Sequence, residues 1–510
     1  MFSSVLSAAI CGVSGRIICV EADVCNGLPE FHMVGYVSSQ VREAQERVRT
    51  ALRNSGIRLE PKKITVNLSP ADLRKEGTGF DLPIACAILM AYGYIGKDVF
   101  QNLMIAGELS LNGEIKGISG ILPMAFAARD QGCKTFIIPK ANEREGGLVD
   151  GIRILGVSSL KELVEYAMGK RAAPVHIGNA PLSCRQEAQS PYEDFSDIHG
   201  QMAARRAAEV AAAGMHNFLM MGPPGSGKSM IARRICGILP GLSKEESLEI
   251  SAIYSVAGML GERHFLMSQR PFRMPHHTIS PQAMAGGGRM PKPGEISLAH
   301  KGVLFLDELP EFSRSALEIL RQPMEEHQIR ISRTHGTYLF PAEFMLVAAM
   351  NPCKCGNYPD RNRCTCTPGE IHRYLGKISR PLLDRIDICV EVSPVRYEDL
   401  SQKEKGETSS DIRERVKRAQ KKQAKRYQGT GFTFNSQLSA SGLRRFCPLG
   451  IHEEAFLKES FQKLELSVRA YHRVIKVART IADLEGADAI SFKHLSEALC
   501  YRTMDQKFWR

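Results

Sequence analysis

The stretch FLMMGPPGSGKSMIARRICGIL, residues 218–239, decides the fold of this chain. An apolar run comes first, a loop rich in Gly and Pro follows, and the last ten residues have a helical pattern. A G-x-x-x-x-G-K-S motif between a strand and a helix is typical of a phosphate-binding loop. Glycines let backbone N–H groups turn inward toward an anion, and the N-terminus of a helix favours negative charge. The stretch therefore predicts a strand–loop–helix unit that binds phosphate.

Within this loop the last two residues carry the chemistry. We expect Lys228 to reach the β- and γ-phosphates of a nucleotide, and the hydroxyl of Ser229 to ligate Mg²⁺. The alternative is a Gly/Pro loop without function, and the flanking strand and helix argue against it. The predicted binding loop consists of Gly222, Pro223, Pro224, Gly225, Ser226, Gly227, Lys228 and Ser229.

Two further apolar runs end in polar side chains. GVLFLDELPEF, residues 302–312, carries Asp307 and Glu308 after its apolar part, and FMLVAAMN ends at Asn351. A carboxylate at the C-terminal end of a parallel strand beside a phosphate loop can hold Mg²⁺ through water, and the next one can orient and polarise an attacking water. We assign these roles to Asp307 and Glu308. Asn351 would position the same water, or would simply cap its strand.

The pattern of elements divides the chain into three folded parts. Residues 196–395 alternate apolar strands with helices, which is typical of a parallel α/β domain. Residues 1–168 mix short strands and helices, residues 169–195 are polar and broken by proline, and residues 396–510 are helical. We therefore predict an α/β multidomain protein with a linker at 169–195 and a helical domain at its C-terminal end.

Composition points to an anionic partner. The net charge is +12 and the pI about 9.0, which favours nucleic acid over a membrane, although a solvated basic surface would give the same numbers. Apolar stretches fall short of the roughly 20 residues that a membrane span needs, and the N-terminus lacks the basic region of a signal peptide. Most cysteines are scattered singly, which indicates reduced thiols and a cytoplasmic location.

Four of the fourteen cysteines form two C-x-C pairs directly after Asn351: Cys353, Cys355, Cys364 and Cys366. Four thiolates at short spacing suit tetrahedral Zn²⁺, and the segment between the pairs is loop-like with almost no apolar residues. C-x-C is tighter than the usual C-x2-C, so free thiols or a redox-labile pair stay open. We expect a structural zinc that pins this loop. The adjacent His276 and His277 make a poor metal site, because no further ligand stands at suitable spacing.

The motifs at 222–229 and 303–308, Asn351 and LLDRIDI at 382–388 together resemble an AAA+ ATPase of the magnesium-chelatase-related and MCM-like branch. PFRMPHHTISPQAMAGGG, AAMNPCKCG and YHRVIKVARTIADLEG are similar to segments of the ComM/YifB family, and the likeness covers nearly the whole chain. The resemblance implies ATP and Mg²⁺ as ligands, and a homo-oligomeric ring, a hexamer, with ATP between subunits. It also implies an arginine finger at Arg385, a sensor-2 arginine at Arg469 of the helical lid, and Arg473 as the substitute.

The family likeness implies a motor that moves DNA, namely a helicase for branch migration in homologous recombination during natural transformation. The segment 328–344, QIRISRTHGTYLFPAEF, alternates like a β-hairpin. It resembles a hairpin that grips DNA in related helicases, and Arg330, Arg333 and His335 are then candidate phosphate contacts, or else solvated charges. The basic run 413–426 leaves the same two alternatives. A chelatase-type or unfoldase ring that remodels a protein partner is the other hypothesis for the whole chain.

The N-terminal part is similar to a known protease domain that has lost its chemistry. PADLRKEGTGFDLPIACAIL, residues 70–89, resembles the proteolytic domain of Lon proteases, which implies a ribosomal-S5-like α/β fold and a Ser–Lys dyad. Gly79 and Leu122 stand at the two dyad positions, and neither side chain can attack a bond or accept a proton. Thr78 and Lys116 lie nearby in sequence but depart from the pattern. We predict a scaffold without peptidase activity.

Overall fold

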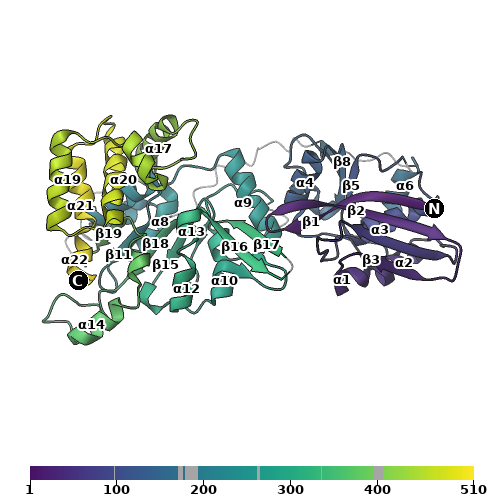
Figure 1. Cartoon of the computed structure of the whole chain (residues 1–510), viewed down its shortest axis with the longest axis horizontal. Coiled ribbons are helices and arrows are strands. Elements are labelled where there is room, and N and C mark those ends of the chain that lie inside the picture. Colours follow the sequence, from purple (N-terminus) through teal and green to yellow (C-terminus); the bar gives the residue numbers. More distant parts are fainter. Residues whose placement is uncertain are drawn as a thin grey trace.

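A computed structural model describes residues 1–96, 98–170, 176–177, 193–260, 265–334, 336–394 and 406–509. Two α/β bodies lie side by side along the long axis, and a set of helices covers the end of the second body (Figure 1). Within the described ranges, no helix combines the length and apolar character of a membrane span. The linker predicted at 169–195 and the boundary at 395 fall largely outside those ranges, so the exact division stays a prediction.

The N-terminal body is one mixed sheet with helices packed on it. Its eight strands run in the order β10-β9-β8-β5-β1-β2-β4-β3. Helix α3 (Asp81–Ala91) is buried along its whole length, which explains why its sequence is apolar on every side. The strands are β1 (Phe2–Cys11), β2 (Ser14–Cys25), β3 (Phe31–Val34), β4 (Lys63–Ser69), β5 (Leu103–Ile105), β8 (Thr135–Pro139), β9 (Arg153–Val157) and β10 (His176–Ile177). The other long helices are α2 (Ala44–Asn54), α4 (Ile121–Asp130) and α6 (Leu160–Ala167).

The second body contains a five-stranded sheet in the order β12-β15-β18-β11-β19, and each neighbouring pair is parallel. Its central strands β11, β15 and β18 are buried throughout, as continuous apolar runs in a covered parallel sheet should be. β11 and β15 therefore flank β18, and the C-terminal ends of all three meet at one edge. The strands are β11 (Phe218–Met221), β12 (Phe272–Arg273), β15 (Val303–Leu306), β18 (Met345–Met350) and β19 (Ile388–Glu391). Helix α7 (Met202–Gly214) precedes β11 in the chain, and helix α8 (Lys228–Ile238) follows it.

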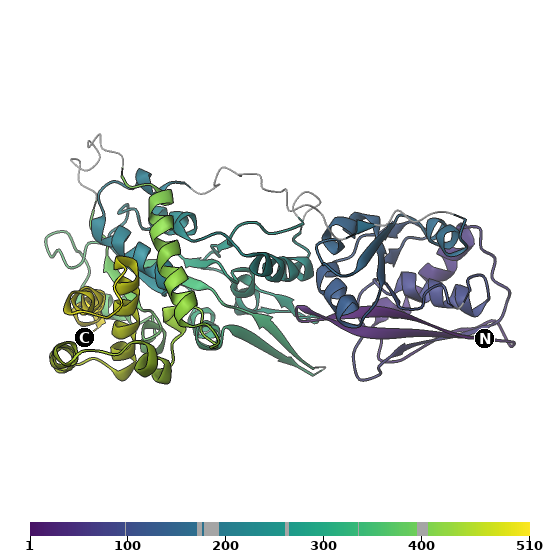
Figure 2. The same cartoon turned by 90° about the horizontal axis from the view of Figure 1, so that it is seen from above.

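The predicted hairpin at 328–344 forms, and the N-terminal body reaches it. β16 (Gln328–Arg333) pairs antiparallel with β17 (Gly336–Pro341). At the β1–β2 turn, Gly12 has a φ of +66°, and a Cβ added there would lie 2.6 Å from the carbonyl oxygen of Leu339. Figure 2 shows the tip of the β1–β2 hairpin beside β16 and β17. A second contact is made by α9 (Lys244–Ala257), which packs against α4.

The C-terminal helices form a lid on the second body. Helix α17 packs against α7, α8 and α20. Several members of its basic run are used inside the molecule: Arg413 donates to the carbonyl of Gly237 at 2.7 Å, and Arg415 pairs with Glu209. Half of the run therefore packs inside the molecule, whereas Lys417, Arg418, Lys421 and Lys425 are exposed. The lid helices are α17 (Ser409–Arg426), α18 (Ala440–Phe446), α19 (Ile451–Lys463), α20 (Val468–Glu485), α21 (Phe492–Cys500) and α22 (Thr503–Trp509).

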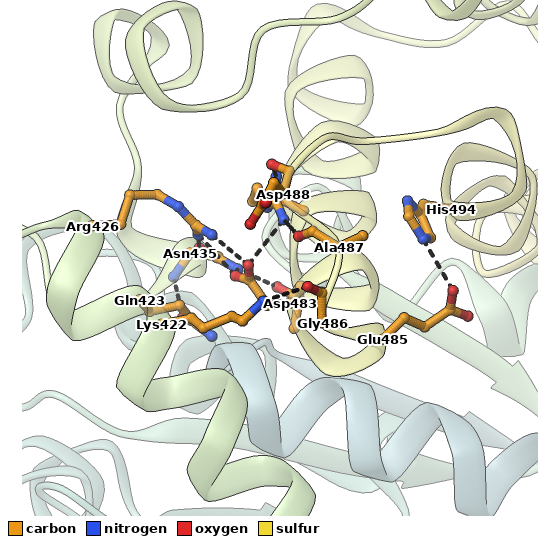
Figure 3. Close-up of polar contacts among 12 residues, drawn as sticks. Lys422, Gln423, Arg426, Asn435, Asp483, Glu485, Gly486, Ala487, Asp488 and His494 are labelled. Atoms are coloured by element: carbon orange, nitrogen blue, oxygen red, sulfur yellow. Dashed lines mark hydrogen bonds and ion pairs between the residues drawn. The ribbon is translucent and has the colours of Figure 1, made fainter.

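A buried carboxylate organises the interior of the lid. The side chain of Asp483 is fully buried and accepts hydrogen bonds from Arg426 at 2.8 Å, from Asn435 at 3.0 Å and from Arg479 at 3.0 Å (Figure 3). Asn435 also donates to the hydroxyl of Thr480 at 2.9 Å. A buried charge is tolerated only when it is paired and hydrogen-bonded, so this network fixes α17 and α20 relative to each other.

A second buried carboxylate joins the lid to the sheet. Asp387, at the start of β19, is 3.2 Å from Arg473 Nε and 3.3 Å from His216 Nδ1, and it accepts from the backbone N–H of Asn217 at 3.2 Å. Burial alone would raise the pKa of Asp387, but the hydrogen bond from His216 and the charge of Arg473 bring it well below the usual value. His216 Nε2 is also 2.8 Å from the Thr480 hydroxyl. Arg473 thus clamps the lid to the sheet.

Replacing Asp387→Asn should loosen the lid, because the buried Arg473 guanidinium then has no carboxylate partner. Removing one partner of a buried pair costs about 3–5 kcal/mol. Hydrogen exchange followed by mass spectrometry should show faster exchange in α20 and an unchanged rate in α3. The control is Glu459→Gln, which removes an exposed pair with Lys463 worth about 0–1 kcal/mol. Wild-type exchange of α20 in Asp387→Asn would contradict the clamp.

Candidate nucleotide site

The phosphate-binding loop closes tightly against the sheet edge. Gly225 and Gly227 have φ values of +74° and +88°, the left-handed region in which glycine carries no steric penalty. Gly227 is the residue before α8, so the loop delivers its backbone directly to the N-terminus of that helix. A backbone of this shape presents N–H groups to an anion, as the sequence motif requires.

The Lys228 side chain links the residues that follow β11 to the residue that follows β18. Its ammonium donates to the carbonyl oxygens of Gly222 and Pro223, each at 2.8 Å, and to Asn351 Oδ1 at 3.2 Å. The side chain is buried, and burial lowers the pKa of Lys228 while the charge of Asp307 opposes that shift. Asn351 therefore lies beside the phosphate loop, where its amide can act on the same reacting groups as the lysine.

A hydroxyl and a carboxylate meet at the neighbouring strand end. Ser229 Oγ donates to Asp307 Oδ2 at 2.6 Å, and Asp307 Oδ1 accepts from the backbone N–H of Glu308 at 3.0 Å. Both oxygens belong to the ligand type that Mg²⁺ prefers, and Mg²⁺ keeps several waters when only one or two protein groups bind it. The donor set therefore fits the metal that the phosphate loop requires.

Glu308 has a histidine partner that the sequence analysis missed. Its side chain is 60% exposed, and its Oε2 lies 3.6 Å from Nδ1 of His277. The His277 ring lies beside that of His276, with centroids 4.1 Å apart and planes tilted by 34°, and meets Phe312 edge-on. The sequence gives no direct signal for this pair, because only the pairing of β12 with β15 brings His277 to Glu308, which follows β15 in the chain.

A cavity of about 1070 Å³ lies against the phosphate loop, large enough for a nucleotide. Gln201 fixes one side by donating to the carbonyls of Ser226 at 3.2 Å and Ser393 at 2.5 Å. Sequence reasoning identified the loop and the cysteine segment, but it did not place the cysteine segment at the cavity, and the remaining walls come from distant segments without a motif. The walls are the phosphate loop 223–227, residues 197–199 with Gln201, residues 391–394, and residues 355–360 with Arg363.

Arg385 and Arg469 do not line this cavity. The Arg385 side chain is 8% exposed, its Nη2 lies 2.5 Å from Glu325 Oε1, and its Nη1 donates to the carbonyl of Pro381 at 2.6 Å. Arg469 is 58% exposed and lies 3.9 Å from Asp384, the residue before Arg385. The two predicted arginines thus lie near each other, at a place other than the nucleotide cavity of their own chain.

The four cysteines after Asn351 converge. Their sulfurs all lie within 4.8 Å of one another, and three of the separations are 3.3, 3.6 and 3.8 Å. A tetrahedron with Zn–S bonds of about 2.3 Å has sulfurs about 3.8 Å apart, so the arrangement fits zinc. Over the described ranges this is the one cluster with metal-ligand spacing. We call residues 353–366 the cysteine knuckle.

The candidate DNA contacts lie on the β16–β17 hairpin. Ile329 and Ile331 are buried, whereas Arg330 and Arg333 are exposed. The Arg333 guanidinium lies 3.4 Å from the position of a Cβ added to Gly287, so this hairpin runs beside the short β13–β14 pair (Gly286–Gly287 and Lys292–Pro293). His335 lies outside the described residues.

The protease-like positions of the N-terminal body hold no dyad. Leu122 is fully buried in the core, and the hydroxyl of Thr78 donates to Glu108 instead of meeting a lysine. Lys116 is exposed on β7 (Ile115–Lys116). Gly79 offers no side chain at all. Neither dyad position therefore offers a nucleophile or a base, and the role of this body as a scaffold stays a prediction.

Comparison with known proteins matches this architecture. The family profile for magnesium chelatase, subunit ChlI, matches residues 194–400, and related profiles for subunit ChlI of Mg-chelatase and for its C-terminal part match 20–142 and 406–502. Lon protease 2 of Bacillus subtilis is 30% identical over 146 residues, which is 27% of this chain and 26% of the protease.

Two full-length relatives show the family. Competence protein ComM of Haemophilus influenzae is 42% identical over 502 residues, covering 98% of this chain and 97% of ComM. YifB of Escherichia coli is 43% identical over 506 residues, covering 99% of this chain and 97% of YifB. The chain therefore belongs to the ComM/YifB family of magnesium-chelatase-like AAA+ ATPases.

Proposed function

We propose that this protein is an ATP-driven ring motor that moves DNA, with branch migration during natural transformation as its role. The main support for ATP hydrolysis is a pair of hydrogen bonds at one sheet edge, Lys228 to Asn351 and Ser229 to Asp307. A cavity large enough for a nucleotide lies beside this edge. Support for DNA comes from the net charge of +12, from the exposed arginine hairpin and from the likeness to a competence protein.

Each residue at the edge has one proposed task. Lys228 leaves its carbonyl partners to bind the β- and γ-phosphates, and Ser229 and Asp307 hold Mg²⁺. When bound, Mg²⁺ neutralises the charge that develops on the phosphate oxygens. Glu308 orients and polarises the attacking water, Asn351 positions it, and His277 sets the direction of the Glu308 carboxylate.

The arginines support a site shared between subunits. Arg385 contacts Glu325 and Pro381, and Arg469 contacts Asp384. None of these partners belongs to the edge that holds Lys228, Asp307 and Asn351, so we propose that both arginines complete the site of a neighbour in a hexameric ring. In the single chain the Arg385 guanidinium is held by Glu325. Glu325 belongs to α13 (Pro323–Glu326), directly before the arginine hairpin, so the proposed finger is connected to the proposed DNA contact.

We also propose that the cysteine knuckle binds one structural Zn²⁺. The sulfur separations fit tetrahedral coordination, and the cysteines of the described ranges are free thiols, which suits the cytoplasmic setting expected from the sequence. The metal would fix the loop that follows Asn351.

A ring that remodels a protein partner is the second candidate, either of the chelatase type or an unfoldase. The observation that favours it is the Lon-like N-terminal body, which contacts the β16–β17 hairpin through the β1–β2 turn. Loss of the dyad removes proteolysis but would leave an unfolding motor intact.

ATP hydrolysis by the purified chain should rise several-fold with single-stranded DNA or a three- or four-strand junction, because a DNA motor hydrolyses ATP in step with its track. The measurement compares no DNA, each DNA and an unfolded protein, with Lys228→Ala as the inactive control. Rates that ignore every DNA but rise with unfolded protein would overturn the DNA proposal and favour the second candidate.

Arg330→Ala and Arg333→Ala should each weaken DNA binding equally for all sequences, because these side chains would neutralise phosphates. Fluorescence anisotropy over a salt series should show the slope of log K against log salt falling by about 1 per arginine. Basal ATP hydrolysis should not change. Arg153→Ala, an exposed arginine of β9, is the matched control. Slopes equal to wild type in both hairpin variants would show that the two arginines are solvated surface charges and do not contact DNA.

A further inference from the structure

We propose that the cysteine knuckle is a metal-controlled wall of the nucleotide cavity, so that zinc binding sets the affinity of the site for ATP. This inference rests on the proposed zinc and ATP sites and adds a regulatory link between them. It starts from three observations: the knuckle touches the phosphate loop, it lines the cavity, and its four sulfurs meet where its two ends come together.

The contact with the phosphate loop is direct. Gly356 has a φ of +82°, and a Cβ added there would overlap the ring of Pro224. Only a glycine lets the two backbones approach this closely. Any displacement of the knuckle therefore changes the space available to the loop that binds the phosphates.

The knuckle also supplies a wall of the cavity itself. Cys355, Gly356, Asn357 and Tyr358 line it, and Pro359, Asp360 and Arg363 continue the same surface. The phosphate loop and this wall thus line one cavity. Residues 197–199 and 391–394 line its other sides. A nucleotide bound there would meet a surface whose position depends on the four cysteines.

Local hydrogen bonds shape the loop of the knuckle: the backbone N–H groups of Gly356, Asp360 and Cys364 donate to the carbonyls of Cys353, Asn357 and Asp360 at 3.0, 3.0 and 2.8 Å. Its backbone is linked by the N–H of Tyr358 to Cys353 Sγ at 3.4 Å and by Asn357 Nδ2 to the carbonyls of Cys355 and Arg363 at 3.3 and 3.4 Å. Tyr358 meets Phe508 of α22 edge-on, with centroids 5.8 Å apart. Thiols are weak donors, so without a metal the four sulfurs add little, whereas Zn²⁺ would join them into one rigid unit.

Zinc binding would therefore preorganise the cavity wall for ATP. With zinc bound, the wall is already in place when ATP arrives; without zinc, the wall must be ordered during binding, and that entropy lowers the affinity. Cys364 and Cys366 do not line the cavity, so an effect of either on ATP binding has to act through the metal. They are therefore the positions at which to test the link.

The test measures zinc and nucleotide binding separately on the full-length chain. Plasma mass spectrometry should find about one zinc per chain. Titration with a fluorescent ATP analogue should give a Kd that rises roughly tenfold or more in Cys364→Ser and after metal removal with a chelator. Added Zn²⁺ should restore the wild-type Kd in the chelated protein only. Cys500→Ser, outside the knuckle, should keep both zinc and affinity, and Lys228→Ala should keep zinc while losing nucleotide.

The outcomes distinguish the proposed zinc site from the proposed effect of zinc on ATP affinity. Protein without zinc would overturn the metal site and leave the ATPase proposal untouched, whereas zinc that can be removed without a change in Kd would overturn the regulatory link alone. Because cysteine variants can misfold, Gly356→Ala serves as a second variant: it keeps the four ligands and forces the knuckle away from Pro224. It should bind zinc normally and ATP more weakly, and wild-type ATP affinity would contradict the wall.

Discussion

The Lys228 ammonium, held between the carbonyls of the phosphate loop and the amide of Asn351, is the interaction around which the second body is arranged. It requires that β11 and β18 be neighbours and parallel, so that their C-terminal ends lie at one edge. The same edge brings Asp307, directly after β15, to Ser229. Parallel strands that share an edge are what allows three distant segments to build one phosphate site.

That edge holds only part of an ATPase. The candidate arginines lie elsewhere, near Asp384, and the position of Arg469 depends on how the lid sits on the sheet. Asp387 joins the lid to the sheet and Asp483 holds the lid helices together, because each carboxylate would be costly to bury without its arginine partners. The lid thus contributes to the surface that would meet the next subunit in the proposed ring, and Glu325, which holds Arg385, lies directly before the β16–β17 hairpin.

Much of the fold could be predicted from local pattern, because a phosphate loop, a carboxylate after an apolar strand and an alternating hairpin are each encoded within a short segment. The cysteine cluster was visible for the same reason. His277 and residues 197–199 were missed, since they reach the site only through sheet order and chain crossing. The basic run of α17 could not be interpreted from charge alone: only the packed lid shows that Arg413, Arg415 and Arg426 have partners inside the molecule.

The central claim is that each ATP site is completed by a neighbour, and mixing two inactive variants tests it most directly. Lys228→Ala and Arg385→Ala should each lose ATP hydrolysis, the latter by roughly a thousandfold. Mixed in equal amounts, they should regain activity, because about a quarter of the interfaces in a random ring would pair an intact phosphate loop with an intact arginine. Mixtures as inactive as the separate variants, in rings shown to exchange subunits, would contradict the shared site.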